Sequence, residues 1–324
     1  MLPVLLLSLL AASAHAQAAA PAAEPAPAIA QQRASPVPAP ARGPDARATV
    51  ELAGLDPAAL AIQELAPTAD APFAVGVWPS RPWQGALLVV DVALPEGASG
   101  VTGRFLGIDL IWHRTGDGIW RGMGPVPDDA RVGRATLQIR ARTAAGTKMR
   151  NIPLEVLPLA WDTDELRVDP KFSRPSKAAR VQIAKDRAAM AAMWKKGSHP
   201  APLFSANFVI PRDDRTTAPY GTRRTFNGTT RSVHRGWDID GEVGEEIRAP
   251  NAGVVTMAQE QYFSGGTLFL DHGGGLYTGY FHMDSFAVKP GDRVEAGDLL
   301  GTVGKTGRVT GPHLHWAAKI GGHY

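Results

Sequence analysis

Short apolar stretches alternate with turn residues through the first half of this chain. Apolar runs cover residues 87–92 and 105–111, and residues 137–142 alternate strictly between apolar and polar side chains. Gly and Pro separate these runs at intervals of about ten residues, and the period of two predicts short antiparallel strands. We therefore expect an immunoglobulin-like β-sandwich over residues 48–160.

The pattern changes to a helical one near residue 176. Residues 176–196 are rich in Ala, Lys, Arg and Met, and Ile183, Met190 and Trp194 recur at spacings that place them on one helical face. Pro175 precedes this stretch and Gly197 follows it, as start and stop signals do. A helical connector is predicted over residues 161–200.

Beyond residue 200 the chain returns to short strands, now rich in glycine. Frequent glycine between short apolar runs is typical of tight antiparallel hairpins. Residues 201–324 are expected to form a Gly-rich antiparallel β-sheet domain. The predicted fold class of the whole chain is all-β, with the helical connector between two β domains.

The N-terminal 47 residues lack this periodicity. Residues 1–16 contain an apolar run followed by small residues, as in a secretory signal peptide, although a short membrane anchor is the alternative. Residues 17–47 are dominated by Ala and Pro and predict a tether. No later apolar stretch reaches about 18 residues, so we expect no stable membrane span in the mature protein. The signal peptide predicts export across the cytoplasmic membrane, to the periplasm or cell envelope.

Composition and charge narrow the functional classes. A net charge of +3, without a basic cluster interleaved with aromatic residues, gives nucleic-acid binding no support. The chain has no cysteine, which excludes disulfides, thiolate metal ligands and a cysteine nucleophile. Any bound metal must be held by His, Asp or Glu.

Five of the nine histidines fall between His234 and His315. His234 and Asp238 lie four residues apart across a Gly-containing turn, while His313 and His315 fall on the same face of a predicted strand and Leu314 on the other. Two imidazoles and a carboxylate form a ligand set that holds catalytic zinc with a position open for water. Each spacing alone is a weak signal.

Several separated segments resemble one family in the expected order. They are SVHRGWD (232–238), YFHM (280–283), VKPGD (288–292), GTVGKTGR (301–308) and TGPHLHW (310–316). Residues 204–324 closely resemble the M23 peptidases, also called the lysostaphin or LytM type. The resemblance implies a groove over a zinc ion and endopeptidase action on bacterial peptidoglycan, in stem or cross-bridge peptides.

Residue by residue, the resemblance implies that His234, Asp238 and His315 bind Zn²⁺. It makes His282 and His313 the catalytic pair that are not ligands, one removing a proton from water and the other stabilising the oxyanion. We favour His313 as the general base, and the two roles remain open.

Two alternatives compete with this interpretation. One is a non-catalytic relative of the same fold that binds the wall or activates another hydrolase; such proteins usually lack ligands, whereas all five positions are filled here. The other is a biotinyl or lipoyl carrier domain, which residues 288–301 also resemble. Neither Lys289 nor Lys305 has the neighbours that such a carrier requires.

His272 is interpreted as a structural turn residue.

Overall fold

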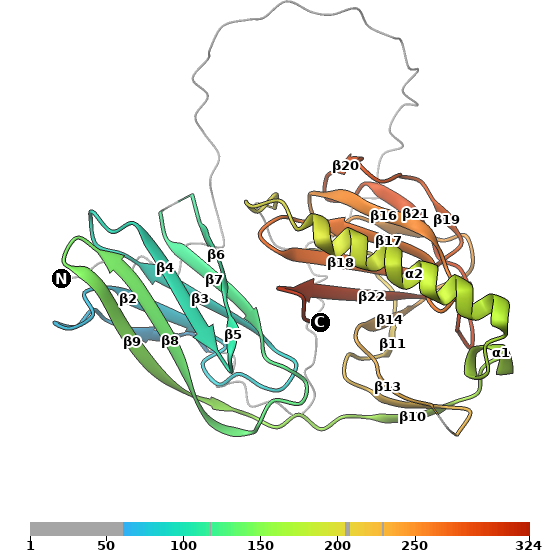
Figure 1. Ribbon diagram of the computed structural model, residues 1–324, viewed down its shortest axis with the longest axis horizontal. Helices are drawn as coiled ribbons and strands as arrows, with labels where there is room; N and C mark the ends of the chain where they lie inside the picture. The colour runs from blue at the N-terminus through green and yellow to red at the C-terminus, as the bar shows by residue number, and fades with distance from the viewer. Residues whose placement is uncertain (1–60, 117, 205–207, 229) are drawn as a thin grey trace, which may run out of the picture. The chain divides into compact units, whose positions relative to one another are not determined.

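The computed structural model describes residues 61–116, 118–204, 208–228 and 230–324 (Figure 1). The predicted signal peptide, the tether and residues 48–60 of the predicted sandwich lie outside these ranges. Within the described residues, no helix is both long and apolar enough to cross a membrane.

The predicted N-terminal sandwich is present as two antiparallel sheets. One sheet has the strand order β1 (Gln63–Leu65), β2 (Ala74–Trp78), β3 (Leu87–Ala93), β7 (Trp120–Pro125) and β6 (Ile111–Arg114). The other has the order β5 (Ile108–Asp109), β4 (Gly100–Phe105), β8 (Gly133–Thr143) and β9 (Gly146–Val156). The alternation in β8 has the expected physical basis, because Leu137, Ile139 and Ala141 are fully buried.

The connector contains the predicted helix together with a strand and a helical turn that the sequence did not predict. It contains strand β10 (Thr163–Leu166), a single turn α1 (Pro170–Ser173) and helix α2 (Lys177–Lys196). Helix α2 begins where the Ser176 hydroxyl accepts from the Ala179 amide and ends at Gly197, whose φ is 73°. Strand β10 was missed because its residues, TDEL, lack β-branched and aromatic side chains at most positions.

The C-terminal domain is built on a seven-stranded sheet. Its order is β11 (Thr216–Ala218), β14 (Trp237–Asp240), β22 (His313–Ile320), β18 (Leu276–Met283), β17 (Gly265–Asp271), β16 (Gly253–Gln261) and β20 (Arg293–Val294). A second sheet has the order β15 (Glu246–Arg248), β21 (Leu299–Thr302) and β19 (Ser285–Phe286). In a third, β12 (Arg223–Phe226) pairs parallel with β10 and antiparallel with β13 (Thr230–Val233).

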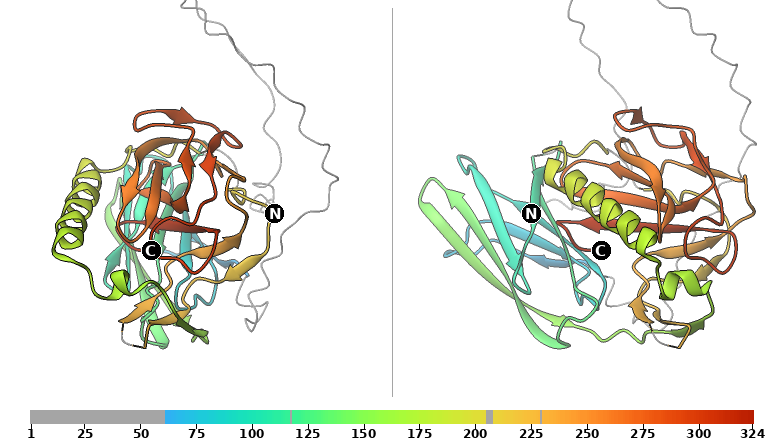
Figure 2. Two further views of the ribbon diagram at one scale, coloured as in Figure 1. Left: turned by 90° about the vertical axis from the view of Figure 1, so that its right-hand side faces the viewer. Right: turned by 45° about the vertical axis from the view of Figure 1, so that its right-hand side comes forward.

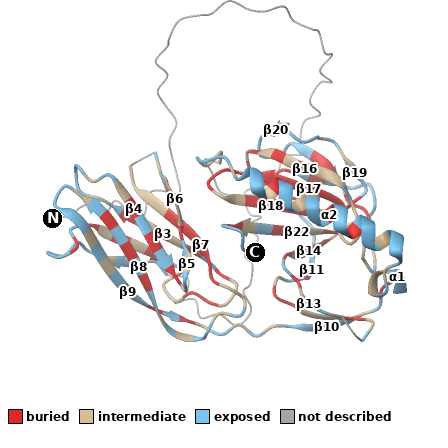
Figure 3. Ribbon diagram, viewed as in Figure 1, coloured by how far each residue is buried: buried red, intermediate tan, exposed pale blue. Residues whose placement is uncertain are grey.

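The main core of this domain joins the seven-stranded sheet to the β15–β21–β19 sheet. It includes Ile239, Leu268 and Leu314 from the first sheet and Ile247 and Leu300 from the second. Figure 3 shows the buried residues concentrated in the central strands. The all-β fold class predicted from the sequence is confirmed.

Helix α2 covers part of the opposite face of the seven-stranded sheet (Figure 2). Met193 packs with Met257 and Phe269, and the Trp194 ring meets the Phe269 ring edge-on at 5.3 Å. Every residue of β17 is buried, because this strand has the core on one side and α2 on the other. The rest of that face, over β14, β22 and the end of β18, carries the candidate site.

Candidate metal centre and catalytic site

Two neighbouring strands bring two of the predicted metal ligands side by side, and His234 lies in the segment just before the first of them. Asp238 on β14 is paired with His315 on β22, and His315 is paired with Phe281 on β18. Paired residues in adjacent strands point to the same face, so Asp238 and His315 meet across the strands. Leu314 points to the opposite face and is fully buried in the core, as the alternation predicts.

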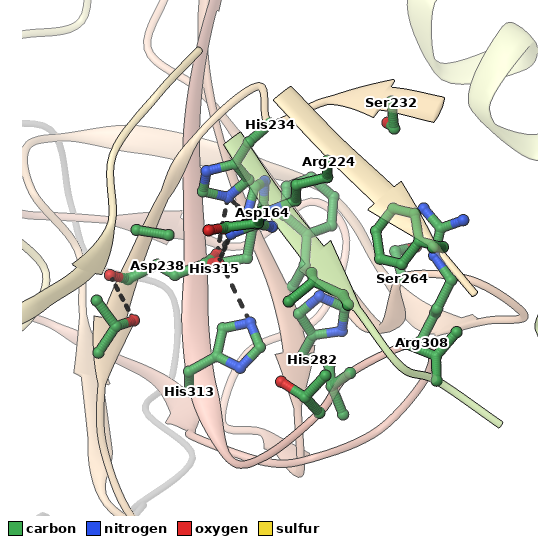
Figure 4. A pocket seen from close by; sticks show the side chains of 18 of the residues that line it. Asp164, Arg224, Ser232, His234, Asp238, Ser264, His282, Arg308, His313 and His315 are labelled. Atoms are coloured by element: carbon green, nitrogen blue, oxygen red, sulfur yellow. Dashed lines mark hydrogen bonds and ion pairs between the residues drawn. The ribbon is translucent and has the colours of Figure 1, made fainter. Parts of the chain in front are cut away.

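The predicted ligand atoms converge closely (Figure 4). Nε2 of His234 lies 2.9 Å from Oδ1 of Asp238, and Nδ1 of His315 lies 2.8 Å from the same oxygen. The two imidazole nitrogens are 2.8 Å apart. Two nitrogens at this distance can only be stable with a proton or a cation between them, since both otherwise direct lone pairs at each other.

The hydrogen-bond partner of the His234 ring fixes which of its nitrogens faces the other two predicted ligands. Nδ1 of His234 is 2.8 Å from the Pro219 carbonyl oxygen, which can only accept, so this nitrogen carries the hydrogen and Nε2 presents its lone pair. A hydrogen bond from the second ring nitrogen to a carbonyl is a recurring feature of metal-binding histidines. Two nitrogens and one oxygen also form a donor set that suits zinc and leaves a coordination position open.

Arg224 holds the outer side of the Asp238 carboxylate. Its Nη2 donates to Oδ2 of Asp238 at 2.6 Å, while Oδ1 faces the two histidines. Burial alone would raise the pKa of Asp238, but the close contacts of its carboxylate with the His234 and His315 rings outweigh burial and the pKa is lowered. The carboxylate is therefore ionised and fixed in orientation, as a metal ligand must be.

His282 reaches the site through an unusual backbone conformation. Strict alternation would place it on the opposite face to Phe281, but its φ is +64°, and its ring lies 5.0 Å from the His313 ring. Nδ1 of His282 donates to the Thr306 carbonyl at 2.9 Å, which leaves Nε2 as the acceptor. Burial, with smaller effects from the neighbouring histidines, lowers the pKa of His282 to about 3.

His313 has a matching arrangement. Its Nδ1 is 2.9 Å from the Gly311 carbonyl oxygen, so the hydrogen lies on Nδ1 and Nε2 is again the acceptor. Nε2 lies 3.6 Å from Oδ1 of Asp238. The loop from Gly304 to His313 thus supplies the carbonyl groups that fix the tautomers of both histidines.

The five predicted residues line one pocket of about 560 Å³. Strand β10 contributes to its wall through Asp164 and Leu166, and β12 contributes Arg224 and Phe226. Neither strand was assigned to the site from the sequence. Arg224 lies outside the motifs that carry the resemblance, and its role depends on the parallel pairing of β10 with β12, which the sequence does not indicate.

His272 lies apart from this pocket. It is completely buried, with Nδ1 2.7 Å from the Ala252 carbonyl oxygen and Nε2 2.7 Å from the Thr278 hydroxyl. Both ring nitrogens are therefore hydrogen-bonded within the domain, which supports the structural interpretation. His199 and His323 do not line the pocket either.

Comparisons with known proteins find similarity over the segment that carries the site. Residues 232–324 match the family model described as peptidase family M23, and this segment contains all five predicted site residues. The peptidoglycan DD-endopeptidase ShyC of Vibrio cholerae is 38% identical over 109 residues, which cover 33% of this chain and 25% of ShyC. The DD-carboxypeptidase/endopeptidase Mpg of Neisseria meningitidis serogroup B is 36% identical over 108 residues, which cover 33% of this chain and 25% of Mpg.

The alignments therefore span only a quarter of the length of these curated relatives. A crystal structure of a Pseudomonas aeruginosa protein assigned to peptidase M23 covers 75% of this chain and 91% of its own, with a TM-score of 0.54 and 24% identity. That likeness concerns the fold alone. The strands that carry the converging histidines and Asp238 thus lie within the segment, residues 232–324, that matches the model of peptidase family M23.

Proposed function

We propose that this protein is a zinc-dependent endopeptidase that hydrolyses peptide bonds in bacterial peptidoglycan. The observation that carries the proposal is the convergence of His234 Nε2, Asp238 Oδ1 and His315 Nδ1 in a pocket that also contains His282 and His313. The matched relatives named as peptidoglycan endopeptidases support the substrate class. Such a substrate places the protein in the cell envelope.

The proposed ligands are His234, Asp238 and His315. When bound, zinc polarises the scissile carbonyl and makes a water molecule more acidic. Asp238 stays ionised because the Arg224 guanidinium donates to its Oδ2. The Pro219 carbonyl keeps His234 in the tautomer that presents Nε2.

His282 and His313 are proposed to handle the proton and the developing negative charge. Both have Nδ1–H bound to a carbonyl, so each presents Nε2 to the reacting groups. Asp238 lies close to Nε2 of His313 and stabilises the imidazolium that forms when this atom accepts a proton. We therefore keep His313 as the general base. His282 presents a lone pair on Nε2, so it must be protonated at this atom before it can donate to the reacting carbonyl oxygen.

Digestion of purified sacculi of known cross-link chemistry tests the proposal, with products identified by mass spectrometry. Wild-type protein should release cleaved stem or bridge peptides, and a chelator should stop it. His282→Ala should abolish cleavage while zinc stays bound, whereas His315→Ala should lose both. A protein that contains zinc and binds sacculi without cutting them would instead be the non-catalytic wall-binding relative.

A further inference from the structure

Arg308 is a pocket cation whose charge is not paired within the described part of the chain. Its guanidinium lies 4.1 Å from the centre of the Phe226 ring and 5.3 Å from that of Phe263, and it forms no ion pair with a described acid. Arg224, in the same pocket, is by contrast bound to Asp238. A half-buried guanidinium without an acid retains hydrogen-bond donors for a ligand.

Arg308 is also held firmly in place. Its backbone N–H donates to the Phe263 carbonyl at 2.8 Å. At the preceding Gly307, a Cβ atom would lie only 2.4 Å from the Gly265 nitrogen, so the two backbones pass in direct contact. The aromatic rings then fix the side chain, which reduces the conformational entropy lost when a ligand binds.

Arg308 lies in the same loop and the same pocket as groups that contact His282. Thr306, two residues earlier in the same loop, provides the carbonyl that binds Nδ1 of His282. In Figure 4, His282 is drawn between His313 and Arg308, and all three line the pocket. A peptide bound across His282 would bring groups next to its scissile bond towards the guanidinium.

We propose that Arg308 binds a carboxylate of the peptide substrate on the His282 side of the scissile bond, and so selects acidic peptides over neutral ones. This inference rests on the proposed peptidase function. A guanidinium fork matches a carboxylate with two parallel hydrogen bonds, a geometry that a neutral glycine-rich bridge cannot offer. The carboxylate is either a chain terminus or a side chain of the substrate.

The energetic cost of burying a guanidinium without an acid also favours binding of a substrate carboxylate at Arg308. Burial, together with the nearby positive charge of Arg224, lowers the pKa of Arg308. A carboxylate in the pocket would relieve both effects, because it supplies an opposite charge and replaces lost water. Arg308 is thus better suited to a substrate anion than to a purely structural contact.

Matched peptides test the proposal. Synthetic cross-linked peptides are prepared with the terminal carboxylate free or amidated, and with the side-chain carboxylate free or amidated. Wild-type kcat/KM should fall roughly 10- to 100-fold when the recognised carboxylate is amidated, mostly through KM. Arg308→Gln should cleave free and amidated peptides equally well, and Arg308→Lys should retain part of the preference.

Arg293→Gln is the matched control, because it removes the same charge from an exposed residue of β20, outside the pocket. It should keep the full preference. Equal sensitivity to amidation in wild type and Arg308→Gln, or no preference in wild type, would overturn the proposal. So would a uniform loss on all peptides in Arg308→Gln together with a lower melting temperature.

Binding separates this inference from the proposed function. The dissociation constants of the same peptides are measured on His313→Ala, with and without Arg308→Gln. The preference for the free carboxylate should appear in His313→Ala and vanish in the double variant. If wild type cuts no peptide, the peptidase proposal fails, yet the ratio of dissociation constants still decides the role of Arg308.

Discussion

Gly236 offers a way to disrupt the proposed metal site without changing a ligand. It lies between His234 and Asp238, and a Cβ at this position would be 2.6 Å from Nε2 of His315 and 2.6 Å from the Trp316 carbonyl oxygen. One of these neighbours is a ligand ring and the other is the backbone of β22. Neither can move without shifting His315 itself.

The size of the effect follows from these distances. Both contacts fall short of an ordinary 3.4 Å separation by about 0.8 Å, whereas ligand distances in metal sites tolerate about 0.2 Å. Gly236→Ala should therefore displace His315 from its bonding position. Mutation of groups that hydrogen-bond to metal ligands lowers metal affinity roughly 10- to 100-fold, and we expect Gly236→Ala to lower zinc affinity by at least as much.

Competition with a fluorescent chelator measures this affinity. Gly311→Ala is the matched control, because it lies in the loop before His313, yet nothing comes within 4 Å of an added Cβ. It should bind zinc as wild type does. If Gly236→Ala also binds zinc with wild-type affinity, then His315 does not have to occupy its observed position, and the assigned ligand set is wrong.

Three further results are expected. Leu314→Ala should reduce the free energy of unfolding by about 2–5 kcal/mol in chemical denaturation, because this side chain is fully buried, and Leu299→Ala, at a residue 37% exposed, should cost clearly less. Asp186→Ala should lower kcat/KM roughly 10- to 100-fold without loss of zinc. The Asp186 carboxylate accepts from the Tyr262 amide and so fixes the turn that leads to Ser264, whose carbonyl accepts from the His282 amide. Unchanged kinetics would contradict this role. Zinc at 100 times its dissociation constant should stabilise the fold by about 2.7 kcal/mol, and a melting temperature independent of zinc would argue against a site specific to the folded state.

The sequence predicts the β architecture because alternating burial leaves a direct trace in the residues. Leu137, Ile139 and Leu314 are buried where a period of two places them. Helix α2 is likewise marked by Ser176 and Gly197 at its ends. Strand β10 leaves no such trace, since it forms by pairing with β12, and pairing between distant segments is not encoded locally.

The residues of the candidate site likewise fall into those that the sequence predicted and those that it did not. His234, Asp238 and His315 were predicted because the segments around them resemble one family, and the pairing of β14 with β22 then brings Asp238 beside His315. Alternation alone would have placed His282 on the wrong face, and only its positive φ turns it towards His313. Arg224 contacts an acid and Arg308 contacts two aromatic rings, and these contacts are not readable from the sequence, although Arg308 itself lies in one of the matching segments.

The central claim is that one zinc ion is held by His234, Asp238 and His315. Anomalous diffraction at the zinc absorption edge, from crystals of the purified full chain, tests it most directly. The account predicts a single strong peak bonded to Nε2 of His234, Oδ1 of Asp238 and Nδ1 of His315 at roughly 2.0–2.2 Å. A zinc peak elsewhere in the chain, or these three side chains free of metal in the presence of excess zinc, would contradict it.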